Sequence, residues 1–216
     1  MSRRTRSALV SFGGAFILAV GFAGFTGELI DETSPDRLDL FVLREVSEVR
    51  SPLITTFFIN FTALGSATLV TLQTVIGFAL LMSAGKRMAA AQLAVAAGGA
   101  HLLTETAKAL IGRPRPAVIP ALVEAVGSSY PSGHAVAAAA LYVTLAFLAS
   151  RYLVSRKQRI LLCVFTAIVV AGVAFSRVYL GVHYASDVVS GVCLGAAWAL
   201  LLEGGRSIWS QMRIEN

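Results

Sequence analysis

Long apolar runs are the feature of this 216-residue sequence that most restricts its fold. The hydrocarbon core of a bilayer is about 30 Å thick, and a helix of roughly 20 apolar residues spans it. Because every backbone group in lipid must find its hydrogen bond within the protein, we predict an all-α transmembrane bundle of six helices. The six candidate spans are residues 8–25, 53–84, 88–111, 135–150, 160–176 and 188–202.

The composition agrees with a membrane protein, since 56% of the residues are hydrophobic and only 14% are charged. The second candidate span is too long for one crossing, and Gly65-Ser66 in its middle predict a break, after which only the later part crosses. A cleaved signal peptide is the alternative for residues 1–25, but the apolar run is long and no A-x-A site follows it. No repeat or soluble segment interrupts the chain, so we predict one membrane-embedded domain over residues 1–216.

Basic residues predict the orientation of the bundle. Eleven of the 18 Lys and Arg residues flank the runs on one side, which the positive-inside rule assigns to the cytoplasm together with both termini. They are Arg3, Arg4, Arg6, Lys86, Arg87, Arg151, Arg156, Lys157, Arg159, Arg206 and Arg213.

The segment 26–52 falls on the opposite, extracytoplasmic side and is rich in acidic residues. Its acidic residues are Glu28, Asp31, Glu32, Asp36, Asp39, Glu45 and Glu48. Apolar residues recur in it at near-helical spacing, as in an amphipathic helix that lies in the membrane interface. These are Leu38, Leu40, Phe41, Leu43 and Val46.

Ionisable residues at the outer ends of the spans indicate a functional site. Such groups are costly at membrane depth, so they tend to be paired inside the bundle and to mark a site. Two histidines join the charged residues there, and one shared pocket explains them all most simply. The set comprises Lys108, Arg113, Arg115, Arg177, His134, His183 and Asp187.

The order and spacing of these residues form three motifs. They read Lys108-x6-Arg115-Pro116, then Pro131-Ser132-Gly133-His134, then Ser176-Arg177-x5-His183-x3-Asp187. On these motifs, over about residues 100 to 195, the chain resembles the type 2 phosphatidic acid phosphatase superfamily, which includes lipid phosphate phosphatases and vanadium haloperoxidases.

The residues of the motifs suit phosphoryl transfer, in which negative charge spreads over the equatorial oxygens. Three fixed cations, Lys108, Arg115 and Arg177, can take the place of a metal ion, for which the pocket offers almost no carboxylate apart from Asp187. The Ser132 hydroxyl and the Gly133 N–H add neutral donors where a helix begins, so the positive end of its dipole also faces the anion. We therefore expect neither a metal nor a cofactor.

The two motif histidines have distinct predicted roles. His183 and Asp187 are four residues apart, so the carboxylate can hold one ring nitrogen while the other attacks phosphorus. His134 would protonate the leaving oxygen and later activate water. The resemblance implies the same roles, with a phosphohistidine intermediate at His183.

Other polar residues near the motifs are open to more than one interpretation. Glu105 lies on one helical stripe with Lys108 and is a candidate to orient it, whereas His101 on the same stripe lacks a motif and is interpreted as structural. Arg113 is either a phosphate contact or a solvated or headgroup-facing charge. The proline-rich segment 112–133 is expected to form a loop that roofs the site. Three tyrosines are assigned to the interfacial belt, namely Tyr130, Tyr179 and Tyr184.

The resemblance implies a metal-independent lipid phosphatase of the cell membrane, with its active site on the extracytoplasmic face. Among the lipid phosphates that similar proteins hydrolyse, which also include phosphatidate and lipid A phosphates, we favour undecaprenyl diphosphate or phosphatidylglycerophosphate. A partner nucleic acid is not expected, and the sequence does not specify an oligomeric state.

Two alternatives to a lipid phosphatase remain. A vanadate-dependent haloperoxidase would use the same pocket, although those relatives are soluble. A transporter or lipid-binding protein could hold an anion there without cleaving it, but binding alone needs no general acid.

Overall fold

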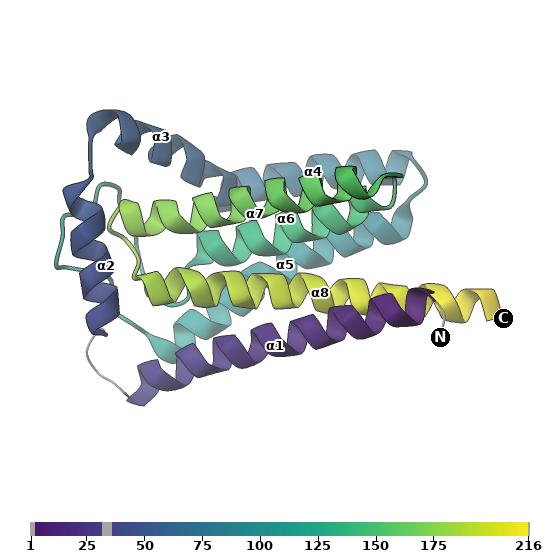
Figure 1. Ribbon diagram of the computed structural model, residues 1–216, viewed down its shortest axis with the longest axis horizontal. Coiled ribbons are helices and arrows are strands. Elements are labelled where there is room, and N and C mark those ends of the chain that lie inside the picture. Colours follow the sequence, from purple (N-terminus) through teal and green to yellow (C-terminus); the bar gives the residue numbers. More distant parts are fainter. Residues whose placement is uncertain (1–2, 32–35, 216) are drawn as a thin grey trace.

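The fold is helical throughout the part of the chain that the structure, a computed structural model, describes, which is residues 3–31 and 36–215. The helices are α1 (Arg3–Asp31), α2 (Arg37–Glu48), α3 (Pro52–Thr62), the 3-10 turn η1 (Ala63–Gly65), α4 (Ala67–Ser83), α5 (Arg87–Ile111), α6 (Gly133–Ser150), α7 (Arg156–Tyr179) and α8 (Ala185–Glu215). The long helices run side by side as a bundle, and α2 crosses one end of it (Figure 1). Both termini lie at the other end.

Close packing of α6 against α8 forms the centre of the bundle. In a bilayer, helices associate through van der Waals contact, for which small residues at the interface allow close approach. A Cβ atom on Gly191 would lie only 2.9 Å from the carbonyl oxygen of Ser132, and α6 meets α8 with a run of buried alanines. The buried alanines of α6 are Ala135, Ala138, Ala139 and Ala140.

The break that the sequence predicts at Gly65-Ser66 is observed. There α3 and α4 bend by 47° relative to each other, and Ser66 caps α4 by accepting a hydrogen bond from the Leu69 N–H at 3.3 Å. A Cβ atom on Gly65 would lie 2.8 Å from the carbonyl oxygen of His134. The break therefore brings the chain against the first turn of α6.

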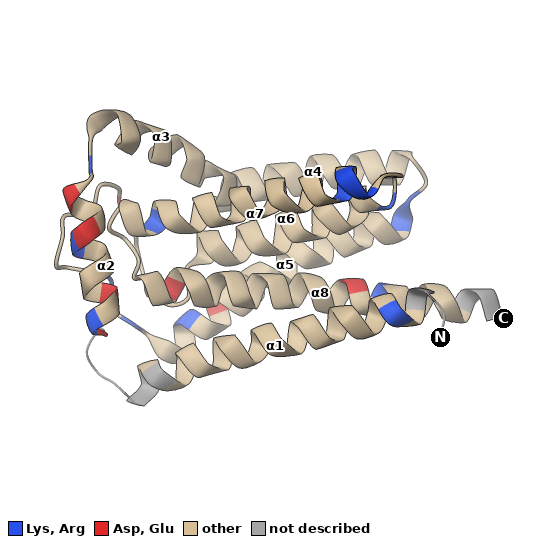
Figure 2. Cartoon of the chain, in the orientation of Figure 1, with Lys and Arg blue, Asp and Glu red and all other residues tan. Residues whose placement is uncertain are grey.

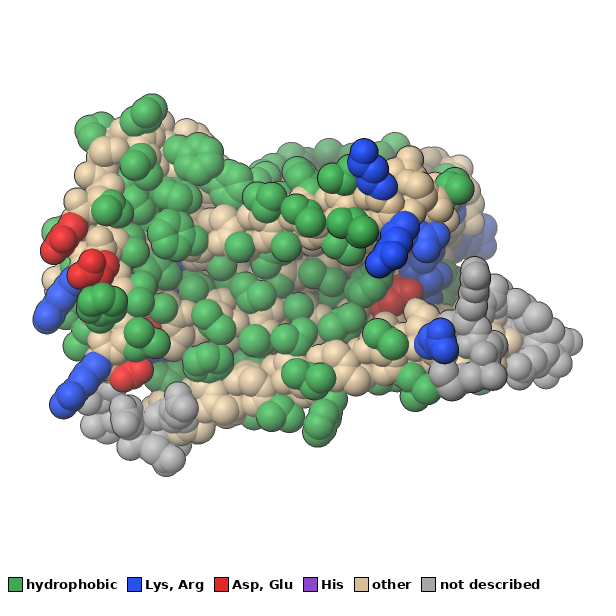
Figure 3. Space-filling view, viewed as in Figure 1, with side chains coloured by type: hydrophobic (Ala, Val, Ile, Leu, Met, Phe, Trp, Pro, Cys, Tyr) green, Lys and Arg blue, Asp and Glu red, His purple; other side chains and the backbone are tan. Residues whose placement is uncertain are grey.

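Length and hydropathy identify which of the described helices could cross a membrane. Among the described residues, α1, α6, α7 and α8 are long and apolar enough to cross a membrane, and the bent pair α3–α4 would be a fifth crossing. The helix α5 occupies the predicted third span and packs against α4 and α6. Apolar side chains cover the middle of the bundle in the view of Figure 3. The all-α prediction is confirmed, while the count of six spans stays a prediction.

Charge is distributed differently at the two ends of the bundle (Figure 2). Lys and Arg gather around the α4–α5 turn, the α6–α7 turn and the later part of α8, at the end that carries both termini. At the opposite end, the acidic residues of α2 lie among further Lys and Arg residues. The orientation is predicted from the basic residues that flank the spans, and it stays a prediction. The side chains of Arg3, Arg4, Glu28, Asp31, Glu32 and Arg213 lie outside the described part of the chain.

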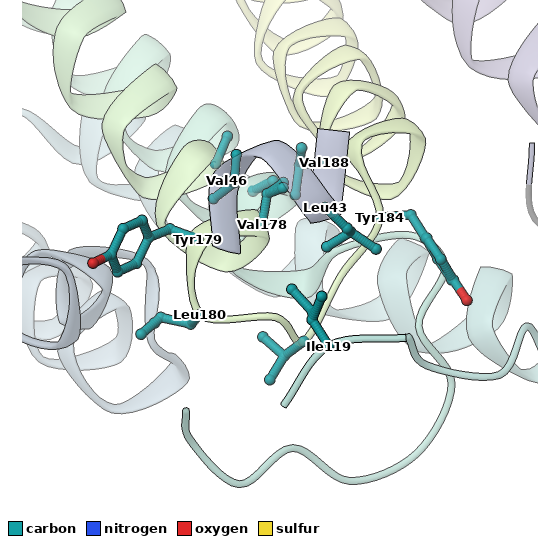
Figure 4. Close-up of a cluster of buried hydrophobic side chains, with 11 residues drawn as sticks. Leu43, Val46, Ile119, Val178, Tyr179, Leu180, Tyr184 and Val188 are labelled. Carbon is teal, nitrogen blue, oxygen red and sulfur yellow. The ribbon is translucent and has the colours of Figure 1, made fainter. Parts of the chain in front are cut away.

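The amphipathic helix predicted within 26–52 is α2, and its apolar face is buried against protein. Leu43 and Val46 join a core cluster with residues of the α7–α8 region (Figure 4), whereas Leu38 and Phe41 stay exposed. The helix is therefore a cover over the end of the bundle, and its position in the membrane interface stays a prediction.

The tyrosine assignment was wrong. Tyr130, Tyr179 and Tyr184 are all buried instead of lying in an interfacial belt. Tyr179 and Tyr184 belong to the same cluster as α2, and Tyr130 stacks on Phe22 of α1. Because each hydroxyl is carried on a large apolar ring, burial against the cover and the bundle is the more stable arrangement.

Arg50, at the corner between α2 and α3, ties the cover to the bundle. Its Nε and Nη2 atoms donate to the Tyr179 carbonyl oxygen at 3.0 and 2.8 Å, and its Nη1 atom donates to that of Pro120 at 2.8 Å. The turn after α7 requires Gly181, whose φ is +76° and where a Cβ atom would lie 2.9 Å from the Pro120 carbonyl oxygen. One arginine thus joins α2, the end of α7 and the 112–133 loop.

Candidate active site

The three sequence motifs meet at the end of the bundle that α2 covers. Each motif residue lies at or next to a helix terminus, so the convergence follows from the bundle placing those termini together. Lys108 is in the last turn of α5, Arg115 follows in the loop, His134 opens α6, Arg177 is in the last turn of α7, His183 is in the α7–α8 turn, and Asp187 is in the first turn of α8.

The imidazole of His183 is held from its Nδ1 side. Asp187 Oδ2 lies 3.4 Å from Nδ1, and the same oxygen accepts hydrogen bonds from the Tyr184 N–H at 2.9 Å and from the Ser129 hydroxyl. Because α8 begins at Ala185, His183 precedes the helix, and the turn brings the pair together. The pairing expected from the spacing is present, although the two residues do not share one helix.

The Nε2 side of His183 faces a fixed cation. Arg115 Nη1 lies 3.2 Å from Nε2 and also donates to the Val182 carbonyl oxygen at 2.8 Å. Further bonds to the carbonyl oxygens of Val126 and Gly127 hold this guanidinium in the loop. Since loop carbonyls fix Arg115, it is in place before any anion binds.

Burial keeps His183 uncharged near neutral pH. Its side chain is almost fully buried, and this burial lowers its pKa to about 4, although the hydrogen bond to Asp187 acts in the opposite direction. A neutral ring that donates from Nδ1 has its lone pair on Nε2. That nitrogen can therefore act as a nucleophile.

Two buried polar atoms in the site have no hydrogen-bond partner among the described residues. They are Arg177 Nε and Ser132 Oγ. Arg177 also donates from Nη1 to the Thr62 hydroxyl at 3.1 Å. Buried polar groups are nearly always paired in folded proteins, so these two donors have capacity for a ligand.

A cavity of about 500 Å³ opens beside the site. Lys108, Gly133 and His134 line it, together with Ala, Val and Thr residues of α4 and α5. A Cβ atom on Gly133 would lie 3.7 Å from Lys108 Nζ, so the ammonium sits beside the N-terminus of α6. Glu105 Oε1 is 3.6 Å from Lys108 Nζ, and His101 also lines the cavity.

His134 lies within electrostatic reach of the other motif residues. It interacts electrostatically with the cations Arg177, Lys108 and Arg115 and with the imidazole of His183. The structure therefore brings both histidines and all three predicted phosphate-binding cations into one region.

Arg113, for which two roles were open, takes neither of them. Its guanidinium is buried between two carboxylates, donating from Nη1 to Asp187 Oδ1 and from Nη2 to Asp39 Oδ2, the latter at 2.8 Å. It also lies over the Tyr184 ring, 4.1 Å from the centroid. Burial lowers the pKa of Arg113, but the two carboxylates outweigh that effect and raise the pKa above its usual value.

The sequence interpretation missed Asp39 and Ser129 as partners of the site. Asp39 was grouped with the acidic residues of the outer segment, yet it is buried. A signal was present, because Asp39 precedes Leu43 and Val46 by four and seven residues and so lies on the apolar face of α2. Ser129 carries no such signal.

The donor set of the site suits an anion better than a metal ion. Over residues 3–31 and 36–215 no group of three or more His, Cys, Asp or Glu side chains is placed to hold a metal. Asp187, the carboxylate of the motifs, is occupied by Arg113, Ser129 and the Tyr184 N–H.

A sequence model of the PAP2 superfamily matches residues 89–205, which is more than half of the chain and includes all three motifs. The chain belongs to the PAP2 superfamily. The resemblance inferred from the motifs is thus confirmed.

Individual PAP2 proteins are similar to this chain in sequence and in structure. Phosphatidylglycerophosphatase B of Bacillus subtilis (strain 168) is 35% identical over 108 residues, which are 50% of this chain and 53% of that protein, so the match spans about half the length of this curated relative. The crystal structure of the first transmembrane PAP2 type phosphatidylglycerolphosphate phosphatase from Bacillus subtilis has a TM-score of 0.82 at 26% identity and covers 89% of this chain and 95% of that one. LpxE of Aquifex aeolicus has a TM-score of 0.61 at 22% identity, covering 81% of this chain and 96% of that one, and shares the fold.

Proposed function

We propose that this PAP2 protein is a membrane phosphatase that hydrolyses a lipid phosphate or diphosphate through a phosphohistidine at His183, without a metal ion. The observation that carries the proposal is the setting of one imidazole. Asp187 contacts the Nδ1 side of His183, and Nη1 of Arg115 lies 3.2 Å from Nε2. This is the arrangement that a histidine nucleophile and its anionic target require.

In the first step of the proposed reaction, the Nε2 lone pair of His183 attacks phosphorus and the bond from phosphorus to the lipid oxygen breaks. His134 donates a proton to that leaving oxygen. Lys108, Arg115 and Arg177 stabilise the charge on the equatorial oxygens, and the Ser132 hydroxyl and Gly133 N–H add neutral donors.

In the second step, water attacks the phosphohistidine. His134 takes a proton from that water, the bond between phosphorus and nitrogen breaks, and inorganic phosphate leaves while His183 regains its lone pair. Asp187 stabilises the positive ring of the intermediate through Nδ1 and does not transfer a proton itself.

The cavity beside the site supports a lipid as the substrate. Lys108 and His134 in its lining fit a phosphorylated head group, and the Ala and Val residues of α4 and α5 fit the first part of a lipid chain. The lipid enters from the bilayer, on the extracytoplasmic face that the distribution of basic residues predicts. Because the Bacillus subtilis sequence relative and the Bacillus subtilis crystal structure are both named as phosphatases of phosphatidylglycerophosphate, we place phosphatidylglycerophosphate ahead of undecaprenyl diphosphate.

An assay of purified protein in detergent over a panel of phospholipid and polyprenyl phosphates tests this function. We expect phosphate release that survives EDTA, stops with orthovanadate, and is fastest for phosphatidylglycerophosphate. His183→Ala should lose at least about a thousandfold in rate, equivalent to roughly 4 kcal/mol of barrier.

Near-normal turnover by His183→Ala would remove it as the nucleophile, and activity restored after EDTA only by a divalent ion would refute the metal-free mechanism. Binding of lipid phosphates without turnover would instead indicate a non-catalytic protein. His101→Gln serves as the matched control, since it changes a histidine of the same cavity to which we assign no chemical role.

A further inference from the structure

Asp39 is a buried carboxylate far in sequence from every motif residue. It lies on α2, and only 3% of its surface is exposed. A buried carboxylate is costly unless it is paired and hydrogen-bonded. Its position at the contact between the cover helix and the site therefore needs a specific explanation.

Both oxygens of Asp39 are occupied by residues next to the catalytic pair. Oδ1 accepts from the Ser186 N–H at 2.9 Å. Oδ2 accepts from Arg113 Nη2 at 2.8 Å and from the Ser186 hydroxyl. Asp39 thus holds the residue directly before Asp187 and the arginine that binds Asp187.

Arg113 connects Asp39 to the catalytic carboxylate. Its Nη1 atom donates to Asp187 Oδ1 and, at 2.8 Å, to the Ser186 hydroxyl. Its Nη2 atom donates to Asp39 Oδ2. A guanidinium is a rigid planar fork, so fixing one nitrogen fixes the direction of the others. With Oδ1 engaged in this way, Asp187 presents Oδ2 to Nδ1 of His183.

The charges of this network favour a positioning role for Asp39. Arg113 is one cation between two carboxylates. Its positive charge is therefore shared between Asp39 and Asp187, and Asp187 is neutralised less than it would be by Arg113 alone. Without Asp39, Arg113 would pair with Asp187 alone, and that carboxylate would stabilise a positively charged His183 ring less well. The effect would be felt when the ring becomes charged, which happens in the intermediate and not on binding.

We propose that Asp39 of α2 is a positioning residue that acts through Arg113 and Ser186 to set the Asp187 carboxylate against His183, so that the cover helix is part of the catalytic apparatus. This inference rests on the proposed phosphatase function. It adds a fourth part of the chain, outside the three motifs, to the site.

The test is Asp39→Asn, which keeps the shape of the side chain and removes its charge. We expect kcat to fall by about tenfold to a hundredfold with KM within about threefold of wild type, because the interaction matters chiefly in the transition state. Glu45→Gln is the matched control, since Glu45 is an exposed carboxylate on the same helix, and its kinetics should equal those of wild type.

A double-mutant cycle separates positioning from simple stabilisation of the fold. If Asp39 acts through Asp187, then Asp39→Asn should lower kcat by less than about twofold further in an Asp187→Asn background. A residue that only stabilises the fold would give independent, multiplying losses. Unchanged kcat in the single variant, or multiplying losses in the double variant, overturns the inference.

A second variant covers the case in which Asp39→Asn does not fold. Ser186→Ala removes one hydroxyl of the network and leaves the pair of Arg113 with Asp39, and it should lower kcat several-fold at unchanged KM. Full activity of Ser186→Ala would then refute the proposal. Absence of phosphatase activity in wild-type protein would instead refute the proposed function, so the two failures are distinguishable.

Discussion

Burial of a single imidazole governs the chemistry proposed for the site. A histidine in water is half protonated near pH 6.5, and a protonated ring has no lone pair with which to attack phosphorus. The enclosed position of His183 suppresses that protonation, while Asp187 and Ser129 keep the ring oriented. The same carboxylate is available when the ring gains its positive charge in the intermediate.

The protonation state of His183 can be measured directly. Its pKa is lowered to about 4, so the ring should stay neutral at pH 5.5, where an ordinary histidine is about 90% protonated. The neutral form is complete well above pH 4 and is lost as the pH falls through 4. Nitrogen-15 NMR of labelled imidazoles is practical because the chain has only three histidines.

A spectrum of His183→Gln assigns the His183 resonance in that titration, because this resonance is absent from the variant. A midpoint for His183 between pH 6 and 7 would contradict the burial argument and would require another source of the neutral nucleophile.

At this scale the sequence predicts the candidate site residues that the fold brings together, and it misses residues that form hydrogen bonds with them. Motif spacing identifies His183, Asp187 and the three cations as one candidate set, and each lies at or near a helix end. Ser129 reaches Asp187 across 58 positions, and Asp39 reaches Ser186 across 147, only because the 112–133 loop and α2 fold over the bundle. Such contacts depend on tertiary packing and leave little local pattern.

Among the helices, the seam between α6 and α8 controls the position of Asp187. Ser132 directly precedes α6, and its N–H donates to the Asp187 carbonyl oxygen at 3.0 Å. Gly191, one turn further along α8, lies against Ser132 and Ala135. A change in the spacing of these two helices would therefore move the Asp187 carboxylate.

Two glycines of α8 offer a matched test of this seam. Gly191→Ala places a methyl group 2.9 Å from the Ser132 carbonyl oxygen, whereas Gly205→Ala on the same helix meets nothing within 4 Å. Alanine favours a helix over glycine by about 1 kcal/mol, so Gly205→Ala should be neutral or stabilising. Gly191→Ala should destabilise by about 1 to 3 kcal/mol through overpacking and should lower kcat.

Thermal unfolding in detergent, together with the phosphatase assay, gives both readouts. Equal melting temperatures for the two variants would show that the seam adjusts freely and does not fix Asp187.

Helix ends were harder to predict than helix centres. The break at Gly65-Ser66 and the start of α6 at Gly133 follow from local chemistry, since glycine and serine interrupt or cap a helix wherever they occur. In contrast, α7 begins at Arg156 and α8 continues to Glu215, beyond the predicted spans 160–176 and 188–202. Apolar runs end at the edge of the lipid, but helical hydrogen bonding continues past it into the polar ends.

Across the molecule, the buried charges of the side chains that the structure describes are confined to the two ends of the bundle. At the covered end, Asp39, Arg113 and Asp187 form the network beside the site. At the end with the termini, Glu203 of α8 pairs with Arg151 and Arg206. Between them the helices pack through apolar and small residues, as expected where ionisable groups would meet hydrocarbon.

The basic residues at the end with the termini predict that this end faces the cytoplasm. Two exposed valines can report the orientation. Val126 lies in the loop beside the site and Val154 in the α6–α7 turn near the basic end, with 91% and 94% of their surfaces exposed. In a background with Cys163→Ala and Cys193→Ala, each valine is replaced singly by cysteine. A membrane-impermeant thiol reagent is then applied to intact cells that express the chain.

Val126→Cys should react in intact cells, and Val154→Cys only after the membrane is permeabilised, because the positive-inside rule places the α6–α7 turn in the cytoplasm. The two sites are matched in residue type and exposure, so a difference in labelling reports sidedness and not reactivity. Retained phosphatase activity would show that both variants are folded. The reverse labelling pattern would place the site on the cytoplasmic face, and the lipid would then have to present its phosphate from the inner leaflet.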